Sequence, residues 1–572
     1  MSKKIYECIE IKDLKDMLNK TRAIYDNDIA YKIRDGKDSY KTYSHEETRQ
    51  MVDALGTALI DIGLKDKRIA VIGDNSMEWE LAYLATVCGT GTIVPLDKSL
   101  PEKELESLIE RSEVEAIFYK DKNEEAVKRI KLLENNKLKH LISMDKKQNE
   151  EGIYSQAELI EKGKALIAAG DRSFIDAKID SEKMSIMLFT SGTTSASKVV
   201  ALSHKNICSN LMAIGSIVKL DRGDVVLSVL PIHHVFECTV GFLFSLYKGA
   251  QTVFCDGLRH IGANLKEYQV SFMACVPGIY ERILGMVSKR FAKEGRLEKL
   301  LEQEIEYENC SMEEKREIYK DIHEMFGGKL KTMVCGAAAL DPKIERKYRQ
   351  LGFPLVQGYG LTETSPVVGV GTELEYKTGS IGKSVPGVEV KIVEANDEGI
   401  GELLVKGPSV MLGYYKNEEA TKDALQDGWF HTGDLAQIDD EGYIFIRGRK
   451  KSVIVLKNGK NIFPEEIENL VNKVEGVKES FIFGKQLSDD QNDIKINCKI
   501  VFDRPVVEEV YKVFDDADIN KVLSEKIKEV NKAMPPYKAI RGLLFSEDPL
   551  IKTSTNKIKR QENLDAIKKF EL

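Results

Sequence analysis

The sequence predicts an α/β protein, because three regions of the chain carry three different patterns. Up to residue 335, short apolar runs alternate with helical stretches, which is typical of parallel sheet covered on its faces. Beyond residue 375, short strands punctuated by glycine indicate a small antiparallel, barrel-like unit. From residue 453 onwards, a hairpin, a helix and further strands indicate a small α+β domain. At 572 residues the chain is also too long for one ordinary core.

Composition and charge exclude several function classes. Hydrophobic residues make up 42% of the chain and charged residues 31%, which describes a soluble globular protein. A net charge of −8 argues against nucleic-acid binding, which usually needs a basic surplus. No apolar run reaches the roughly 18 residues of a membrane span, and the first residues lack a signal-peptide core. We predict no transmembrane segment, while peripheral membrane contact and the oligomeric state stay open.

The cysteines indicate the compartment. All nine are scattered, and none forms a Cys-x-x-Cys pair. Most of them lie in or beside apolar runs, where a reduced core residue is a better interpretation than a disulfide or a metal ligand. We therefore predict a cytoplasmic protein.

Short apolar runs in the first third of the chain predict buried strands with helices between them, one of them over residues 102–111. A turn at residues 73–76 is suited to cap the helix that follows the first strand. The predicted strands are Arg68–Ile72, Thr92–Leu96, Ala116–Tyr119 and His140–Met144.

A polar loop at residues 190–198 follows the apolar run 185–189 and precedes an expected returning strand at 199–202. Its glycine lets backbone N–H groups approach an anion, and its hydroxyls and lysine add donors and charge, which suits a polyphosphate. The spacing is not that of a Walker A loop, and composition alone also fits a solvated loop. The candidate phosphate-binding residues are Thr190, Ser191, Gly192, Thr193, Thr194 and Lys198.

After this loop, apolar residues at helical spacing from Ile207 to Val218 predict a helix that starts near Ser203 or His204. Residues 287–326 are densely charged with a helical pattern, and we assign them no chemistry. Further strands are predicted at Val225–Leu230, Gln251–Cys255, Ser271–Val276 and Leu330–Cys335.

Two histidines, His233 and His234, follow the strand that ends at Leu230. They could be ordinary loop residues. A zinc site is poorly supported, because no further ligands lie at a suitable spacing.

The segment Gln357–Thr364 is predicted to form a glycine-rich turn between a strand and a helix. Two glycines flank Tyr359, so its aromatic face could stay open for a purine to stack on. Thr362 offers a hydroxyl, and Glu363 offers a hard oxygen ligand for Mg²⁺. A surface turn with an ordinary glutamate is the plainer alternative.

Further along, Asp434 follows Gly433 in an apparent tight turn, where its carboxylate suits ribose hydroxyls or a simple Asx turn. The basic run at residues 447–451 is a candidate domain boundary, although such runs are usually solvated. Beyond it, residues 453–463 predict a hairpin with an Asn-Gly turn, and Pro464 with two acids predicts a helix start. Strands at 480–483 and 495–502 complete this small domain.

Several of these segments, in this order, resemble the motifs of the adenylate-forming superfamily, which includes acyl-CoA synthetases, luciferases and peptide-synthetase adenylation domains. The loop at 190 resembles TSGTTGxPKG, with Ser195, Ser197 and Val199 replacing Gly, Pro and Gly. QGYGLTET at 357–364 matches the nucleotide and magnesium motif without a break, and 432–434 matches the ribose motif. Residues 552–560 resemble K-T-x-x-G-K-I-x-R, with Asn556 replacing Gly.

The resemblance implies a fold and a domain division. A large N-terminal part of doubly wound sheets plus a small β-barrel would span residues 1–447. A hinge would lie at 448–452, about Lys451, and a mobile C-terminal α+β domain at 453–572. The stretch Pro-x-x-His-Val-Phe-Glu, which contains His234, looks most like the long-chain fatty acyl branch.

The resemblance also implies a reaction and its cofactors. A carboxylic acid, expected to be a medium- to long-chain fatty acid, would react with ATP and Mg²⁺ to acyl-AMP and then with coenzyme A to acyl-CoA. Lys557, Glu363, Thr190 and His234 would be catalytic, with Glu363 and Thr190 at the metal. Beside the phosphate loop and Lys557, the cofactor-binding residues would be Gly336, Ala337, Gln357, Tyr359, Thr362, Asp434, Arg449 and, for pantetheine, Gly459.

Three alternatives share these motifs. An acyl-AMP ligase would transfer its product to a carrier protein instead of coenzyme A. A luciferase-like enzyme would consume oxygen. The replacements at residues 195, 197, 199 and 556 could also mark a degenerate acyl or nucleotide sensor. Retention of five motif residues argues against that: Lys198, Glu363, Asp434, Arg449 and Lys557.

Overall fold

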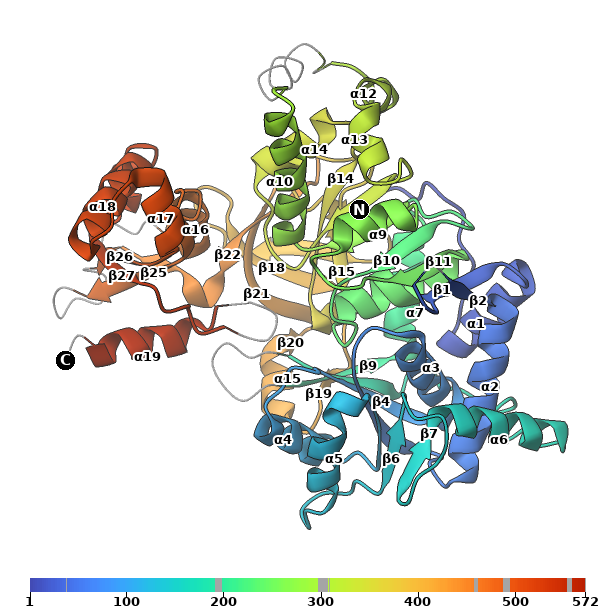
Figure 1. Cartoon of the computed structure of the whole chain (residues 1–572). Helices are drawn as coiled ribbons and strands as arrows, with labels where there is room; N and C mark the ends of the chain where they lie inside the picture. Colours follow the sequence, from blue (N-terminus) through green and yellow to red (C-terminus); the bar gives the residue numbers. More distant parts are fainter. Residues whose placement is uncertain are drawn as a thin grey trace.

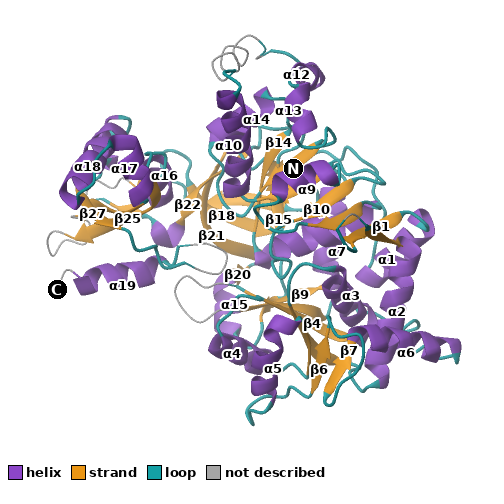
Figure 2. Cartoon of the chain, viewed as in Figure 1, coloured by secondary structure: helices purple, strands orange, loops and turns teal. Residues whose placement is uncertain are grey.

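The computed structural model describes residues 1–37, 39–190, 198–296, 307, 309–456, 461–486, 494–552 and 558–570. Figure 1 shows a large part built from two sheets with helices between and around them. A smaller, C-terminal part, coloured orange to red, lies to one side of it (Figure 1). Coloured by secondary structure, Figure 2 shows mixed α/β architecture throughout, as the sequence predicts.

The first sheet holds nine strands among the described residues, in the order β16-β15-β14-β13-β12-β10-β11-β1-β2. It is parallel from β14 through β1, and antiparallel strands form both edges. The four strands predicted between residues 225 and 335 are confirmed as β10 to β13. The strands are β1 Ile29–Arg34, β2 Tyr40–Ser44, β10 Val225–Ser228, β11 Gln251–Phe254, β12 Phe272–Cys275, β13 Thr332–Cys335, β14 Leu355–Gly360, β15 Val367–Val370 and β16 Lys383–Ser384.

The second sheet has the order β19-β9-β8-β4-β3-β5-β6-β7 in the described chain. The strands β8, β4, β3, β5, β6 and β7 are parallel to one another. The strand β9 is antiparallel to both of its neighbours, β8 and β19. The predicted strand that returns after the phosphate loop is therefore confirmed as β9. The strands are β3 Lys67–Ile72, β4 Gly91–Leu96, β5 Ala116–Tyr119, β6 His140–Ser143, β7 Ile153–Ser155, β8 Met184–Phe189, β9 Val199–Ser203 and β19 Gly413–Tyr414.

One apolar core fills the space between these two sheets, and several helices contribute to it. Ser76 and Ser203 cap α3 and α7, because each side chain accepts a hydrogen bond from a first-turn N–H. The helix predicted to reach Val218 ends earlier, at Gly215. The helices are α1 Leu14–Tyr25, α2 His45–Asp61, α3 Met77–Ala85, η1 Thr86–Thr90, α7 His204–Gly215, η3 Glu237–Leu243 and α8 Phe244–Lys248.

Other helices cover the outer faces of the two sheets (Figure 1). The charged helical stretch predicted at residues 287–326 includes the end of α10 and the short helices α12 and α13, with 297–306 and 308 outside the described residues. These outer helices are α4 Glu102–Ser112, η2 Asp121–Asn123, α5 Glu124–Lys131, α9 Ile261–Glu267, α10 Pro277–Lys293, α12 Met312–Ile318, α13 Lys320–Met325 and α14 Pro342–Gln350. The helix α6 Gln156–Ala168 instead packs against α2, on the side of the core between the sheets.

The glycine-punctuated region forms an open antiparallel sheet, a half-barrel, with the order β17-β18-β21-β20 and β22 paired to β21. The turn predicted before Asp434 is wrong: Asp434 lies inside the long strand β21, and Gly433 adopts a positive φ of 68° there without ending the strand. The elements are β17 Glu389–Val393, β18 Gly401–Lys406, α15 Glu418–Ala424, β20 Leu425–Gln426, β21 Trp429–Ile438 and β22 Ile444–Arg449.

The C-terminal part is the expected α+β unit. Side chains alternate across its sheet, so Ile482 and Cys498 pack with the α16 and α18 side, while Phe481 and Phe483 pack with α19. The boundaries at residues 447 and 453 stay a prediction. The elements are η5 Lys450–Ser452, β23 Ile454–Val455, β24 Asn461–Ile462, α16 Pro464–Val471, β25 Val477–Gln486, β26 Ile494–Phe502, α17 Arg504–Tyr511, α18 Asp516–Lys532, η6 Pro536–Lys538, β27 Gly542–Ser546 and α19 Arg560–Phe570.

The strands β23 and β24 confirm the predicted hairpin, and α16 begins at Pro464 as expected. The Asn-Gly turn itself, residues 457–460, lies outside the described residues. Among the helices that the structure describes, none is both long enough and apolar enough to cross a bilayer.

Candidate active site

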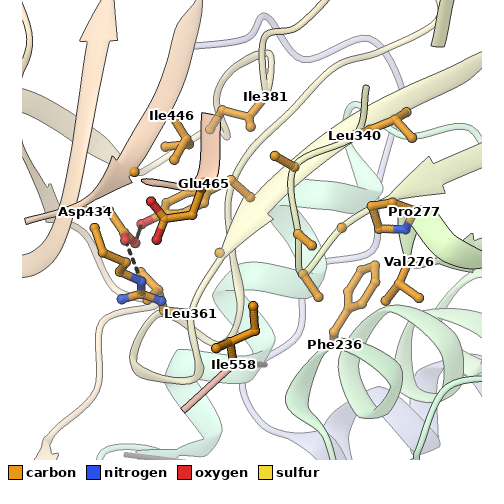
Figure 3. A pocket seen from close by; sticks show the side chains of 18 of the residues that line it. Phe236, Val276, Pro277, Leu340, Leu361, Ile381, Asp434, Ile446, Glu465 and Ile558 are labelled. Carbon is orange, nitrogen blue, oxygen red and sulfur yellow. Dashed lines mark hydrogen bonds and ion pairs between the residues drawn. The ribbon is translucent and has the colours of Figure 1, made fainter. Parts of the chain in front are cut away.

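One large cavity, of about 2710 Å³, lies where five neighbouring parallel strands end. Because β10 to β14 run in the same direction, the loops that follow them meet at one edge of the sheet, which is where α/β proteins bind ligands. The half-barrel and the C-terminal part line the opposite wall, and Figure 3 shows Asp434, Glu465 and Ile558 facing it. The loops supply lining residues within 228–236, 255–261, 276–282, 336–342 and 357–363.

The cavity has a polar side centred on Tyr359, Asp434 and Arg449. The Tyr359 hydroxyl donates to Asp434 Oδ2 at 2.5 Å, and Arg449 Nε lies 2.9 Å from Asp434 Oδ1. Asp434 and Arg449 are also register partners across β21 and β22, so the sheet itself aligns them. Figure 3 draws both contacts. Burial, and then the charge of Asp434, raise the pKa of Tyr359 well above its usual value, so the phenol remains a donor.

The second polar cluster joins Glu363 and Lys198 through Tyr414. The Tyr414 hydroxyl donates to Glu363 Oε1 at 2.9 Å, and Lys198 Nζ lies 4.5 Å from the centre of the Tyr414 ring. The sequence does not predict a role for Tyr414, because nothing around residue 414 indicates that it pairs with the strand after the phosphate loop. The register partner of Tyr414 is Val200, two residues beyond Lys198.

The donor set of this cluster fits Mg²⁺. Magnesium is usually held by one or two carboxylates together with substrate phosphates and water, and Glu363 supplies one carboxylate beside the phosphate loop. Among the described residues, no group of three or more His, Cys, Asp or Glu side chains could hold a metal ion by itself. The arrangement therefore suits a metal that arrives with a polyphosphate.

Thr190 and Lys198 form the base of the predicted phosphate loop. The Thr190 backbone N–H donates to the Lys198 carbonyl at 2.9 Å, and both residues line the cavity. The loop ends are thus held together at the end of β8. The four remaining candidates, Ser191, Gly192, Thr193 and Thr194, lie outside the described residues.

The predicted adenine-edge segment lines the cavity at Gly336 and Ala337. A Cβ on Gly336 would lie 2.9 Å from the Phe236 ring, so only glycine lets this ring lie so close to the backbone. Ala337 holds a positive φ of 65°. Gln357 is buried with its amide in internal hydrogen bonds, accepting from Leu340 N at 3.1 Å and donating to Glu345 Oε2 at 3.1 Å. The Gln357 side chain therefore holds the end of the 336–340 segment in place through Leu340.

His234 lines the cavity, and its ring centre lies 4.6 Å from that of His233. His233 Nε2 is 3.6 Å from Asp97 Oδ2, yet burial lowers the pKa of His233 to about 4, so its imidazole is neutral at pH 7. The neutral His233 ring therefore packs beside His234 in the wall of the cavity. Thr362 also lines the cavity, next to Glu363.

A buried polar network supports the His234 loop and was not predicted. Ser228 Oγ donates to Glu237 Oε1 at 2.6 Å, and Asn75 Nδ2 donates to Ser228 Oγ at 2.8 Å and to the Leu230 carbonyl at 2.7 Å. Burial raises the pKa of Glu237 to about 8. The sequence gives only a weak signal for this network, an acid within an otherwise apolar helical stretch.

An apolar side of the cavity lies across from the polar side that contains Tyr359, Asp434 and Arg449. Its members belong to, or pack on, the large apolar core between the two sheets. Phe236 marks its edge in Figure 3, opposite Asp434. The apolar side comprises Ile214, Val218, Phe236, Val240, Phe244, Val334, Val367 and Val370.

Two C-terminal candidates, Lys557 and Gly459, lie outside the described residues. The described neighbours of Lys557, Ile558 and Arg560, line the cavity. Arg560 is fixed by ion pairs with Glu468 at 2.6 Å and Glu465 at 3.0 Å. The predicted hinge residue Lys451 lies in η5 and also lines the cavity.

Comparison with known proteins finds relatives that match most of the chain. It is 29% identical over 576 residues to long-chain-fatty-acid–CoA ligase 1 of Homo sapiens, covering 91% of this chain and 81% of that protein. It is also 29% identical over 521 residues to the chloroplastic long-chain-fatty-acid–[acyl-carrier-protein] ligase AEE15 of Arabidopsis thaliana, covering 77% and 70%.

Solved structures share the fold. ATP-bound MatB from Rhodopseudomonas palustris has a TM-score of 0.75 at 22% identity, over 98% of this chain and all of that one. The anthranilate CoA ligase AuaEII in complex with anthranoyl-AMP has a TM-score of 0.75 at 19% identity, over 97% of each chain. The model of the AMP-binding enzyme family matches residues 19–415, and that of the AMP-binding enzyme C-terminal domain matches 451–570. This chain therefore belongs to the AMP-binding enzyme family, within the adenylate-forming superfamily.

Proposed function

We propose that this enzyme activates a medium- to long-chain fatty acid for transfer to coenzyme A. A carboxylate oxygen attacks the α-phosphorus of ATP, forming acyl-AMP and releasing pyrophosphate. The thiol of coenzyme A then attacks the acyl carbonyl, forms the thioester and releases AMP. The observation that carries the proposal is one cavity in which an apolar side, built from the protein core, faces a polar side suited to a nucleotide.

The apolar side supports an aliphatic substrate. Val240, Phe244 and Val334 are each at most 5% exposed although they line the cavity, so a ligand there would be removed from water. Each methylene buried contributes about 0.8 kcal/mol, so affinity should rise with chain length until the space is filled. The human relative at 29% identity, named a long-chain-fatty-acid ligase, supports the same substrate class.

The first half-reaction brings two anions together, so cations must offset their repulsion. Lys198 at the base of the phosphate loop would bind the β- and γ-phosphates. Lys557 would approach the α-phosphate and the acyl carboxylate. Glu363 and the Thr190 hydroxyl would hold Mg²⁺, which polarises phosphoryl oxygens when bound. His234 would lie beside the carboxylate.

The remaining polar residues would fix the nucleoside. Tyr359 would stack on the purine, and Gly336 and Ala337 would let its edge approach the backbone, with Thr362 close by. Asp434, held by Tyr359 and Arg449, keeps a fixed carboxylate for the ribose hydroxyls. The C-terminal part would then turn about the hinge at 448–452, moving Lys557 away and bringing the Gly459 hairpin to pantetheine.

The proposal is tested with a panel of saturated acids from acetate to palmitate, assayed for pyrophosphate release and for loss of the coenzyme A thiol. We expect kcat/KM to rise with chain length, and a preference for acetate or an aromatic acid would contradict the proposal. Gly278→Leu sharpens the test, because Gly278 lines the cavity and a Cβ there meets no atom within 4 Å. The added side chain should shift the preferred acid to a shorter one.

Gly285→Leu is the matched control. Gly285 lies on the same helix α10, also has nothing within 4 Å of a Cβ, and is not among the cavity-lining residues. This variant should keep the parent preference. An equal shift in both variants would assign the effect to the helix instead of the cavity.

A carrier protein is the second candidate acceptor, because the Arabidopsis relative at 29% identity is named an acyl-carrier-protein ligase. The two acceptors separate when acyl-AMP is supplied with either free coenzyme A or a phosphopantetheinylated carrier protein. Thioester formation on the carrier alone would replace the proposed second step and leave the first one intact.

A further inference from the structure

We propose that Tyr414 is a positioning residue that orients both Glu363 and Lys198 toward the metal-bound polyphosphate. This rests on the proposed role of Glu363 at the metal and goes beyond it. The evidence is geometric: the Tyr414 hydroxyl donates to Glu363 Oε1 at 2.9 Å, while its ring face receives Lys198 Nζ at 4.5 Å. One side chain therefore contacts both an anion and a cation of the polar side.

The two contacts are of different kinds and use different parts of the tyrosine. The hydrogen bond to a charged acceptor is directional and fixes which way the Glu363 carboxylate faces. The cation–π contact depends on the ring alone and restrains the long Lys198 side chain. Glu363 and Tyr414 are 51 positions apart in the chain, and the pairing of β19 with β9 places Tyr414 beside the strand that follows Lys198.

The backbone around Tyr414 is itself held in place. Its N–H donates to Thr421 Oγ1 at 2.9 Å, and the preceding Gly413 has a positive φ of 146°, with a Cβ there lying 2.8 Å from the Thr421 side chain. Glu363 is tied to the same segment, because the Met411 N–H donates to the Glu363 carbonyl at 2.8 Å. The backbone that carries Tyr414 is therefore bonded both to the helix α15, through Thr421, and to Glu363, through Met411.

The next residue, Tyr415, offers an unusually close control. Its hydroxyl donates to Glu113 Oε2 at 2.9 Å, and Arg68 lies 4.8 Å from its ring centre, so it has the same two kinds of contact. Tyr415 is not among the cavity-lining residues, whereas Tyr414 is. Comparing variants at the two positions therefore distinguishes the effect of losing the hydroxyl beside Glu363 from the effect of losing any similarly bonded tyrosine hydroxyl.

The test measures metal binding without turnover. Mn²⁺ is titrated into enzyme saturated with ATP, in the absence of any carboxylate, and free Mn²⁺ is followed by electron paramagnetic resonance. Tyr414→Phe should weaken Mn²⁺ binding about tenfold, because the carboxylate loses its orienting donor. Tyr415→Phe should bind as the parent does. Melting temperatures of all variants check that the fold is retained.

A second measurement isolates the contact with Lys198. Binding of ATP in the presence of a chelator should be unchanged in Tyr414→Phe, since the ring remains, and weakened several-fold in Tyr414→Leu, since it does not. Equal loss in both variants, or in neither, would overturn the assignment of the ring to Lys198.

Glu363→Gln distinguishes failure of this proposal from failure of the proposed function. If Glu363→Gln weakens Mn²⁺ binding and Tyr414→Phe does not, Glu363 is the ligand and Tyr414 does not position it. If neither variant changes Mn²⁺ binding, the metal role of Glu363 itself is wrong. An equal change in Tyr414→Phe and Tyr415→Phe would show a general effect of the strand and would also overturn the proposal.

Discussion

The polar and apolar sides of the cavity are built in opposite ways. The polar side consists of side chains held by specific hydrogen bonds and ion pairs, such as Tyr359 and Arg449 on Asp434. The apolar side consists of core residues, such as Val240 and Phe244, whose hydrocarbon side chains line the cavity and are held by packing. We infer that the function of the polar side depends on individual charged groups and hydrogen-bonding atoms, whereas the function of the apolar side depends on the shape and volume of the space it encloses.

This difference predicts different responses to substitution. Removing one charge from the polar side should change a rate by orders of magnitude and leave stability nearly intact. Changing the groups behind the apolar side should change stability, pH dependence or chain-length preference, and have less effect on the chemical step. Three predictions test this contrast, in decreasing order of expected effect.

The largest effect is expected for Lys557→Ala. One charge-assisted contact in a dry site contributes about 3 kcal/mol to the transition state, so acyl-AMP formation should fall at least roughly a hundredfold. Pyrophosphate release from acid and ATP measures this step. Thioester formation from synthetic acyl-AMP and coenzyme A should stay near the parent rate. An equal fall in both steps would make Lys557 structural, or a residue used twice.

An intermediate effect is expected for Glu237→Gln, which concerns the group buried behind the His234 loop. Burial raises the folded-state pKa of Glu237 to about 8, above an ordinary value of 4.5. Between these values the unfolded chain releases the proton while the folded chain keeps it. The free energy of unfolding therefore decreases as pH rises from about 5 to 8. The neutral glutamine avoids this loss, which approaches about 1.4 kcal/mol for each pH unit.

Melting temperatures measured from pH 5 to pH 8.5 check this prediction. The melting temperature of Glu237→Gln relative to the parent should increase steadily as pH rises. The control is Glu110→Gln on an exposed position of α4, for which the difference should not vary with pH. A constant or falling difference for Glu237→Gln would show that Glu237 is ionised in the folded protein.

The smallest effect is expected for Lys473→Ala. Lys473 Nζ lies 2.5 Å from Asp341 Oδ2, so this ion pair joins the chain just after α16 to the N-cap of α14. Lys473 is 43% exposed, so the pair contributes at most about 1 kcal/mol. The ratio of the two half-reaction rates should shift up to about fivefold, and raising the salt concentration should bring the parent toward the variant. A salt-independent ratio in the parent would argue against this role.

Much of the polar side could be predicted from the sequence, because its motifs are contiguous. Residues 357–364 carry the tyrosine, hydroxyl and carboxylate within eight positions, and Thr190 and Lys198 bracket one loop. A short apolar run also predicts a strand whichever partner it pairs with, which is why β3 to β6 and β10 to β13 agree with expectation. Local chemistry is enough for such features.

Only the tertiary structure decided which distant residues meet. Tyr359 and Asp434 are 75 positions apart, and Tyr414 and Glu363 are 51 positions apart. The pairing of β19 with β9 places Tyr414 beside the strand that follows Lys198. The turn expected before Asp434 was wrong because a glycine at positive φ fits inside a bulged strand as well as in a turn. The apolar side could not be recognised at all, since a valine that lines a cavity and a valine packed in the core have the same sequence pattern. The alternation of side chains along a strand specifies which of its faces is apolar. Which residues pack against that face depends on the order in which the strands pair, and the sequence of one strand does not contain that order.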